Sequence, residues 1–399
     1  MRGFKQVQKL LLVAFAVIAA SFGVVACGSD NGGGDSGSSG GAVKGDGVKA
    51  GTGTRAEKAI AAGTAAGTEA GAKTLEPKTI GIINFLGGIE SSDRLKSTAE
   101  LAATKLGYKS IVCDGKGTPT VFVTCGNSLL DQGVDAIVEI AIEPGTIQPV
   151  LDKANKKDPV VPIIQIGGGA VPIGDLAGTY GPDEIKAGQL LTDYLAKELD
   201  ALPEATVPVI VHDFPAAWGK LRTDQFRKFV KTQDKIKIAA TTITDAGNLV
   251  QSTRKIVGDQ LTANPDVKAF WFTFDTTGQV GGQVITAKFP GKAFPDKPLV
   301  ATFHADLGTL DLMAKGNIDV TSEANYDAAS WIALDQLASA WAYGTEISKV
   351  EQPIYPGVGD LFGYQIITKD NLPTAGEYVA PPVDVVSFFN AKWKAQYGV

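Results

Sequence analysis

The feature that most constrains the fold of this chain is a regular alternation of short β-branched runs with longer helical patterns, which begins at Thr79. The sequence predicts strands at 79–84, 109–113, 136–140 and 161–166, separated by predicted helices at 92–106, 122–132 and 146–155. Such an alternation predicts a parallel sheet covered on both faces, because right-handed crossovers place a helix between successive strands.

A second series of the same kind follows the segment 179–183. A helix to about Leu199 precedes predicted strands at 207–212, 237–242, 269–274 and 299–303 and predicted helices at 220–232, 249–263 and 278–288. A helix at 330–343 and a strand at 363–367 then complete the two units. The folded part exceeds 300 residues, more than one hydrophobic core usually holds. We therefore predict an α/β fold of two doubly wound parallel-sheet lobes with a hinge of about three crossings.

The predicted first lobe comprises residues 76–182 and about 324–350, and the predicted second lobe comprises 183–323 and about 351–399. In open parallel sheets, ligands bind beyond the carboxyl ends of the strands. Two such sheets that face each other place a cleft between the lobes. The residues that follow each strand are therefore the candidates for a site.

The start of the chain has the pattern of a bacterial export signal. Basic residues at positions 2, 5 and 9 precede an apolar run at 10–20, and small residues at 24–26 precede Cys27. A membrane-spanning anchor is the alternative, but the run is shorter than the roughly 20 residues that a spanning helix needs. Residues 24–27 resemble the lipobox of bacterial lipoproteins, which implies that residues 1–26 are a signal peptide and that Cys27 carries the lipid. Ordinary cleavage beside a stray cysteine is the other interpretation.

The segment that follows the cysteine has almost no bulky apolar side chains. Residues 28–73 are nearly all Gly, Ser, Ala, Thr, Asp and Lys, too little apolar surface to offset the entropy of ordering. We predict a disordered tether over residues 27–75.

Disulfides persist in an exported protein, so we expect Cys113 and Cys125, twelve positions apart, to be bridged, with two separately buried thiols as the alternative.

Charge and motifs exclude several classes of protein. The net charge of -6 and the absence of a basic cluster in the folded part exclude nucleic acid as a partner. Neither a GxxxxGK[ST] loop nor an HExxH pair occurs, so we predict no enzyme activity, no cofactor and no metal. His212 beside Asp213 could act as a general base, but no nucleophile signature accompanies the pair, which favours a hydrogen bond at the cleft rim.

Several helix-to-strand junctions carry a resemblance to a known family. They are the sequences KLGY at 105–108, LDQGVDAI at 130–137, KAN at 153–155 before VPII, and NPDVKA at 264–269. In order and spacing the chain resembles the type I periplasmic sugar-binding proteins, which include the ribose and galactose receptors. The resemblance spans most of residues 79–372 and implies a ligand held between two lobes.

The resemblance also implies which residues bind the ligand. Position by position, the family's binding residues fall on the loop after the first strand, on the crossover, at the start of a second-lobe helix and after two second-lobe strands. The candidates are Phe85, Ser91, Ser92, Asp183, Trp218, Arg222, Asp275, His304 and Asp306. An arginine fork donates to vicinal hydroxyls or a carboxylate and an aspartate accepts from hydroxyls, although Arg222 and Asp183 could also be surface charges.

Two departures separate this chain from the sugar receptors. The family usually places aromatic rings where this chain has 90–92 (ESS), and an Asp-Arg pair where it has Gly167–Gly169. Trp271 and Phe274, predicted on a strand, favour core packing, whereas Phe85 and Trp218 are the better candidates for aromatic walls.

The function implied by the resemblance is that of an extracytoplasmic solute-binding receptor of an ABC-type importer. Such a receptor is a monomer that binds a sugar, a polyol or a related small polar molecule and delivers it to the importer permease. A lipid at Cys27 would hold it on the outer face of the cell membrane. A receptor for a membrane signalling protein and a surface-anchored enzyme on a flavodoxin-like scaffold are the alternatives.

Overall fold

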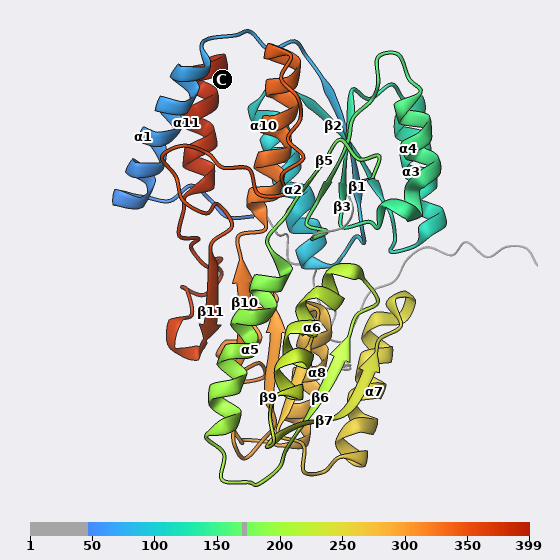
Figure 1. The fold of residues 1–399 in the computed structure, drawn as a ribbon, viewed down its shortest axis with the longest axis vertical. Coiled ribbons are helices and arrows are strands. Elements are labelled where there is room, and N and C mark those ends of the chain that lie inside the picture. Colours follow the sequence, from blue (N-terminus) through green and yellow to red (C-terminus); the bar gives the residue numbers. More distant parts are fainter. Residues whose placement is uncertain (1–46, 170–173) are drawn as a thin grey trace, which may run out of the picture. The chain divides into compact units, whose positions relative to one another are not determined.

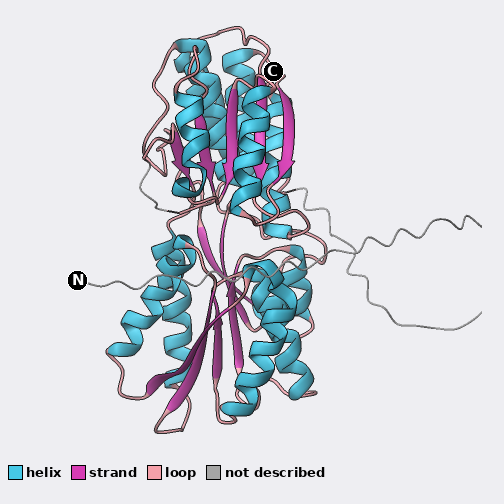
Figure 2. Ribbon diagram, turned by 90° about the vertical axis from the view of Figure 1, so that its right-hand side faces the viewer, coloured by secondary structure: helices cyan, strands magenta, loops and turns pink. Residues whose placement is uncertain are grey.

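The strands form two sheets in the part of the chain that the computed structural model describes, residues 47–169 and 174–399. One sheet has five strands in the order β2-β1-β3-β4-β5, and the other has six in the order β11-β10-β9-β8-β6-β7. Neighbouring strands are parallel except β10 and β11. Figure 2 shows helices flanking both sets of strands. The predicted α/β fold with two parallel-sheet lobes is confirmed.

The first sheet is buried between two helical layers. Its elements are β1 (Thr79–Asn84), α2 (Glu90–Lys105), β2 (Lys109–Asp114), α3 (Pro119–Asp131), β3 (Ala136–Ile140), α4 (Gln148–Asn155), β4 (Ile163–Ile166) and β5 (Gly178–Tyr180). Alternate residues of β1 enter different apolar cores: Ile80 and Ile82 pack into one, and Ile83 packs into the other. A strand buried on both faces needs apolar residues at every position, which explains the continuous apolar run of β1.

The second sheet is also buried on both faces by apolar cores. Its elements are α5 (Glu184–Asp200), β6 (Val207–Asp213), α6 (Ala217–Lys231), β7 (Ile236–Ile243), α7 (Leu249–Ala263), β8 (Ala269–Phe272), α8 (Asp275–Lys288), β9 (Leu299–Phe303), α9 (Leu307–Ala314), β10 (Val320–Ala324) and β11 (Tyr364–Thr368). Val209 and Val211 of β6 pack into one core, whereas Ile210 packs into the core on the opposite face. Alternate side chains of a strand point to opposite faces, so β6 contributes to both layers.

The end of the chain returns to the first lobe twice. Helix α10 (Asp327–Tyr343) follows β10 but packs into the first-lobe core. After β11 has joined the second sheet, helix α11 (Val385–Tyr397) packs into the first-lobe core through Phe388 and Trp393. The prediction that 351–399 belongs to the second lobe is therefore wrong apart from β11, because the apolar side chains of α11 complete the first-lobe core.

The predicted tether contains a packed helix. Helix α1 (Gly53–Ala70) lies beside α11 in Figure 1, and a Cβ added at Gly63 would lie 2.2 Å from the backbone oxygen of Phe388. Its buried residues are Ala56, Ala59, Gly63 and Gly67, a stripe of small side chains that lets two helix backbones approach closely. The prediction of disorder is wrong for this segment because close backbone packing replaces large apolar side chains as the source of stability.

A disulfide joins Cys113 of β2 to Cys125 of α3, with the Cα atoms 5.6 Å apart, which confirms the predicted bridge.

The predicted signal peptide and Cys27 lie outside the described residues. None of the helices in the described ranges is long and apolar enough to span a membrane.

Candidate functional site

A cavity lies at the carboxyl ends of strands from both sheets. Phe85, Ala141 and Gly167 follow β1, β3 and β4 of the first sheet, and Phe214 and His304 follow β6 and β9 of the second. The side chains around the cavity thus come from two lobes. This is the position expected for a ligand site in facing doubly wound sheets.

The wall of the cavity is mostly apolar. Its residues are Phe85, Leu86, Ile89, Ser91, Ser92, Leu95, Gly117, Ile140, Ala141, Gly167, Phe214, Trp218, Arg222, Ala246, Leu249, Phe274, His304 and Tyr326. The cavity volume is about 670 Å³ when the part open to solvent is included. Pockets that hold one small molecule usually have volumes of about 300–1,000 Å³, so the cavity suits a single small molecule.

Three aromatic rings of the second lobe form one wall. The ring of Phe214 stacks on Trp218 with centroids 5.2 Å apart, and Phe274 lies 4.9 Å from Phe214 and 5.5 Å from Trp218. Strand β8 ends at Phe272, so Phe274 lies just before α8 rather than on the strand. Phe85 and Trp218 line the cavity as predicted, and Phe274 lines it as well, whereas Trp271 is a core residue.

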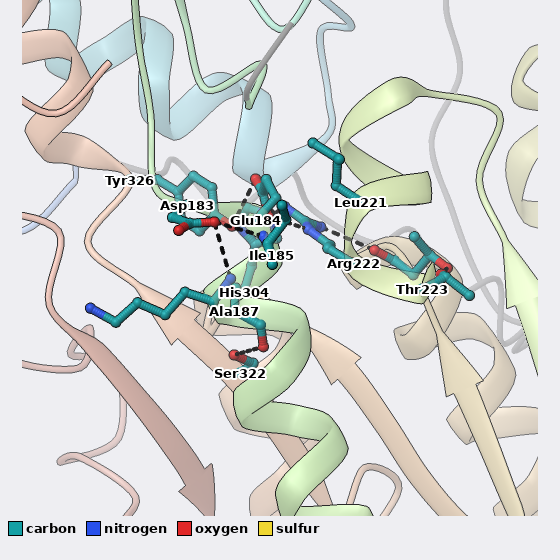
Figure 3. Close-up of polar contacts among 12 residues, drawn as sticks. Asp183, Glu184, Ile185, Ala187, Leu221, Arg222, Thr223, His304, Ser322 and Tyr326 are labelled. Carbon is teal, nitrogen blue, oxygen red and sulfur yellow. Dashed lines mark hydrogen bonds and ion pairs between the residues drawn. The ribbon is translucent and has the colours of Figure 1, made fainter. Parts of the chain in front are cut away.

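Arg222 and Glu184 form a buried ion pair at the second-lobe side of the cavity wall. Arg222 of α6 donates through Nε and Nη2 to the two carboxylate oxygens of Glu184, over 2.5 and 2.9 Å. Its Nη1 donates to the carbonyl oxygen of Thr273 over 3.0 Å, and Nη2 also lies 2.9 Å from the hydroxyl of Tyr326. Figure 3 shows these side chains converging from α5, α6 and the segment after β10. Arg222 is thus in the cavity wall, but most of its donors are used within the protein.

The charge on Arg222 is permanent. Burial lowers the pKa of its guanidinium, but the Glu184 carboxylate and the Tyr326 hydroxyl favour the charged form more strongly, so the net shift is upward. Its planar group also lies over the Trp218 ring, 4.6 Å from the ring centroid. The arginine therefore holds the aromatic wall in place as well as the ion pair.

His304 has a defined hydrogen-bonding state. Its Nε2 lies 3.1 Å from Arg222 Nη2, and since a guanidinium can only donate, Nε2 accepts and the ring proton is on Nδ1. Burial, and then the positive charges of Arg222 and Arg94, lower the pKa of His304 far below its usual value, so the ring is neutral. The backbone of His304 has a φ of 62°, which is uncommon for a residue other than glycine.

Asp183 is not in the cavity wall. It is the N-cap residue of α5, and its Oδ1 accepts from the backbone N–H groups of Ile185 and Lys186 over 2.9 and 3.1 Å. The next residue, Glu184, is the buried acid that pairs with Arg222. The carboxylate that the sequence pattern placed at 183 is therefore supplied one position later.

Asp275 and Asp306 lie behind the cavity wall. Both are fully buried, and their carboxyl groups lie against each other. Burial raises the pKa of both groups, and the negative charge of Asp275 raises that of Asp306 further. The nearby hydroxyl of Ser91 lowers the pKa of Asp275 in part, and Arg94 of α2 lies 3.2 Å from Asp306.

These acids connect the two lobes. Arg94 of the first lobe pairs with Asp306 of the second lobe over 3.2 Å and is held within its own lobe by Asp327 at the start of α10, over 2.9 Å. Glu90 of the first lobe accepts from the backbone N–H groups of Leu307 and Gly308 at the start of α9, over 2.7 and 2.9 Å. Asp306 therefore belongs to a set of contacts between the lobes, and the cavity wall itself contains Phe85, Ser91, Ser92, Trp218, Arg222 and His304 of the predicted residues.

The structure gives no support to a catalytic role for His212. Its ring is buried, and Nδ1 lies 2.8 Å from the hydroxyl of Thr242 on the neighbouring strand. Burial lowers the pKa of His212 to about 4. Over residues 47–169 and 174–399, no cluster of His, Cys, Asp or Glu side chains could hold a metal ion.

Sequence reasoning missed Glu184, Phe214 and Tyr326. Phe214 directly follows β6, so the rule of examining residues after strands could have found it. Tyr326 follows β10, a strand that the sequence did not predict, and Glu184 carried no signal beyond its place beside Asp183.

Comparisons with known proteins agree with this geometry. Residues 80–346 match the family model described as "Periplasmic binding protein domain". No curated protein matches the chain in sequence. A solved galactofuranose-binding protein is 19% identical with a TM-score of 0.63, and the alignment covers 74% of this chain and 95% of that one.

Two further solved structures are similar. A carbohydrate transporter solute-binding protein from Agrobacterium radiobacter in complex with D-arabinose is 21% identical, with a TM-score of 0.61 over 75% of this chain and 97% of that one. An ABC transporter solute-binding protein from Mycobacterium smegmatis with bound glycerol is 18% identical, with a TM-score of 0.63 over 76% of this chain and 100% of that one. At these identities the likeness concerns the fold.

Proposed function

Because the chain belongs to the periplasmic binding protein domain family, we propose that it is the solute-binding receptor of an ABC-type importer for a sugar, a polyol or a related small molecule. The observation that carries the proposal is the single cavity wall built from both lobes, with Phe85 and Ser92 on one side and Trp218 and Arg222 on the other. A ligand there gains contacts from both lobes only when they are together, so binding favours the closed arrangement.

The solved structures described above support the ligand class. Their bound or named solutes are galactofuranose, D-arabinose and glycerol, which share small size and several hydroxyl groups. A cavity for one small molecule agrees in size with solutes of this kind.

Calorimetric titration of the purified protein with pentoses, hexoses, inositols and glycerol tests the proposal. Ala246 is a half-buried residue of the cavity wall that packs against the cluster of Phe214, Trp218 and Phe274, so Ala246→Trp should fill the cavity and weaken binding at least tenfold. Ala263→Trp, at the exposed end of α7, is the matched control and should bind as the parent does. Equal affinity in all three proteins would place binding elsewhere, and no saturable binding by any solute would contradict the receptor function.

Delivery to a permease is tested in cells. Deletion of the gene should abolish uptake of the radiolabelled solute identified by calorimetry, and the parent protein, but not Ala246→Trp, should restore it. Uptake that persists without the protein would contradict the importer role and favour a sensory one.

We also propose that Cys27 carries a lipid that holds the protein on the extracytoplasmic face of the membrane. The support is the order of charged, apolar and small residues before Cys27. Cys27→Ser should move the protein from the membrane pellet to the soluble fraction. Retention of the variant in the pellet to the same extent as the parent would contradict lipid attachment.

A further inference from the structure

The cavity offers hydrogen-bond donors but few acceptors. Among the described residues of its wall there is no aspartate, glutamate, asparagine or glutamine side chain. These are the side chains that accept hydrogen bonds most readily from ligand hydroxyl groups. The polar side chains that do line the cavity are serine, arginine, histidine and tyrosine.

Of the two serine hydroxyl groups in the wall, that of Ser92 already makes hydrogen bonds within the protein. Ser92 donates to Asn84 Oδ1 over 2.5 Å and accepts from the backbone N–H of Leu86 over 3.2 Å. The Ser91 hydroxyl lies close enough to the buried carboxyl of Asp275 to lower the pKa of that carboxyl. A ligand hydroxyl therefore finds little free accepting capacity on the first-lobe side.

On the second-lobe side of the wall, Tyr326 and Arg222 also make hydrogen bonds within the protein. Tyr326 lies 3.3 Å from both carboxylate oxygens of Glu184, to which its hydroxyl donates, and it accepts from Arg222. Glu184 also neutralises Arg222, so the wall presents no uncompensated positive charge to an anionic ligand. The ion pair of Glu184 and Arg222 therefore adds no net charge to the cavity wall.

His304 provides one oriented donor. Because its Nε2 accepts from Arg222, Nδ1 carries the proton, and the hydrogen bond that the ring makes to the described residues is the one at Nε2. The rest of the second-lobe wall is the aromatic surface of Phe214, Trp218 and Phe274. A suitable ligand therefore has an oxygen that accepts from Nδ1 and an apolar face that packs on the rings.

We propose that the solute is a small neutral molecule with acceptor oxygens and an apolar face but few hydroxyl donors, such as an O-methylated or deoxygenated sugar or polyol. The proposal rests on the receptor function proposed above and narrows its ligand class. A fully hydroxylated sugar would leave several hydroxyl protons without acceptors on entering the cavity, and each desolvated donor without a partner weakens binding. Methylation of a hydroxyl removes the donor, keeps the acceptor and adds apolar surface.

Matched ligand pairs test this proposal by calorimetry on the whole protein. The probes are D-galactose with its 6-deoxy form D-fucose and its methyl β-glycoside, and myo-inositol with a monomethyl ether. In at least one set, the methylated or deoxygenated member should bind tenfold or more tightly than its parent. Parents that bind as tightly or more tightly would overturn the proposal and leave the receptor function standing. No saturable binding by any probe would overturn both.

Variants at His304 test the oriented donor with the tightest methylated or deoxygenated probe. His304→Leu removes the donor and should weaken binding at least tenfold. In His304→Asn the side-chain amide takes the place of Nδ1–H, and asparagine tolerates the positive φ of 62° at this position. The asparagine variant should bind at least fivefold more tightly than the leucine variant. Equal affinity of the two, with circular dichroism showing both folded, would overturn the role of His304.

Discussion

The buried pair of Glu184 and Arg222 makes a quantitative prediction about stability. Removing one partner of a buried ion pair leaves an uncompensated charge and typically costs about 3–5 kcal/mol. In Glu184→Gln, Arg222 would keep its contacts to the carbonyl oxygen of Thr273 and to Tyr326, so we expect the lower end, about 3 kcal/mol of unfolding free energy. That loss corresponds to roughly 6–12 °C in melting temperature for a large domain.

The assay is urea unfolding followed by circular dichroism at pH 7 without added solute. In the double variant Glu184→Leu with Arg222→Met, both charges are replaced by apolar groups, so the loss should be smaller than in Glu184→Gln alone. Asp224→Asn removes an exposed partner of Lys220 on α6 and should change stability by less than about 0.5 kcal/mol. A loss below about 1 kcal/mol in Glu184→Gln, or a double variant as unstable as the sum of its single variants, would refute the assignment of a coupled buried pair.

Three further predictions concern other parts of the molecule. Replacing Cys113 and Cys125 by Ser should cost about 3 kcal/mol, the chain-entropy value for a loop of about 12 residues, and the urea midpoint of the parent should fall on reduction; a midpoint insensitive to reductant would contradict this. Burial raises the pKa of Glu139 to about 8 from 4.5, so the folded state holds the proton more tightly and stability falls as pH rises between these values. Glu139→Gln should therefore show a smaller fall than the parent between pH 6.5 and 8, and identical slopes would show that the carboxyl does not titrate there. Gly63→Ala should destabilise by about 1–3 kcal/mol because its Cβ would overlap the α11 backbone, whereas Gly258→Ala, with open space around it on α7, should be neutral or stabilising; similar melting temperatures for the two variants would argue against close packing of α1 on α11.

The sequence predicted correctly both strands that are buried on two faces, such as β1, and edge strands with exposed residues, such as β2 and β7. The run at 79–84 is predicted as a strand and forms β1, because Ile80 and Ile82 enter one apolar core and Ile83 enters the other. Strand β10 was missed although it is equally buried, since Thr321, Ser322 and Glu323 are polar. Glu323 accepts from the backbone N–H of Ala305 and lies 3.6 Å from Arg94, partners that become neighbours only in the folded chain.

For the candidate site, the sequence predicted the location of the cavity but not the orientation of its side chains. The rule that ligands bind after the ends of parallel strands located the cavity and placed Phe85 and His304 in its wall. The orientation of individual side chains was not predictable from that rule. Asp183 turns back to cap α5, which left Glu184 to pair with Arg222, and only the geometry of the first helical turn decides between the two acids.

The pairing of α1 with α11 determines where a recombinant protein has to begin. The backbone of Lys73 donates to the carbonyl oxygen of Gln396, and Gly51 donates to Asp384, so the residues on both sides of α1 are hydrogen-bonded to the end of the chain. A fragment starting at residue 76 would leave the α1-facing side of α11 in contact with water and would lose the hydrogen bond from Val48 to Asp327. Protein prepared for ligand screening should start no later than residue 47, because a shorter fragment would expose a new surface for self-association before any solute is added.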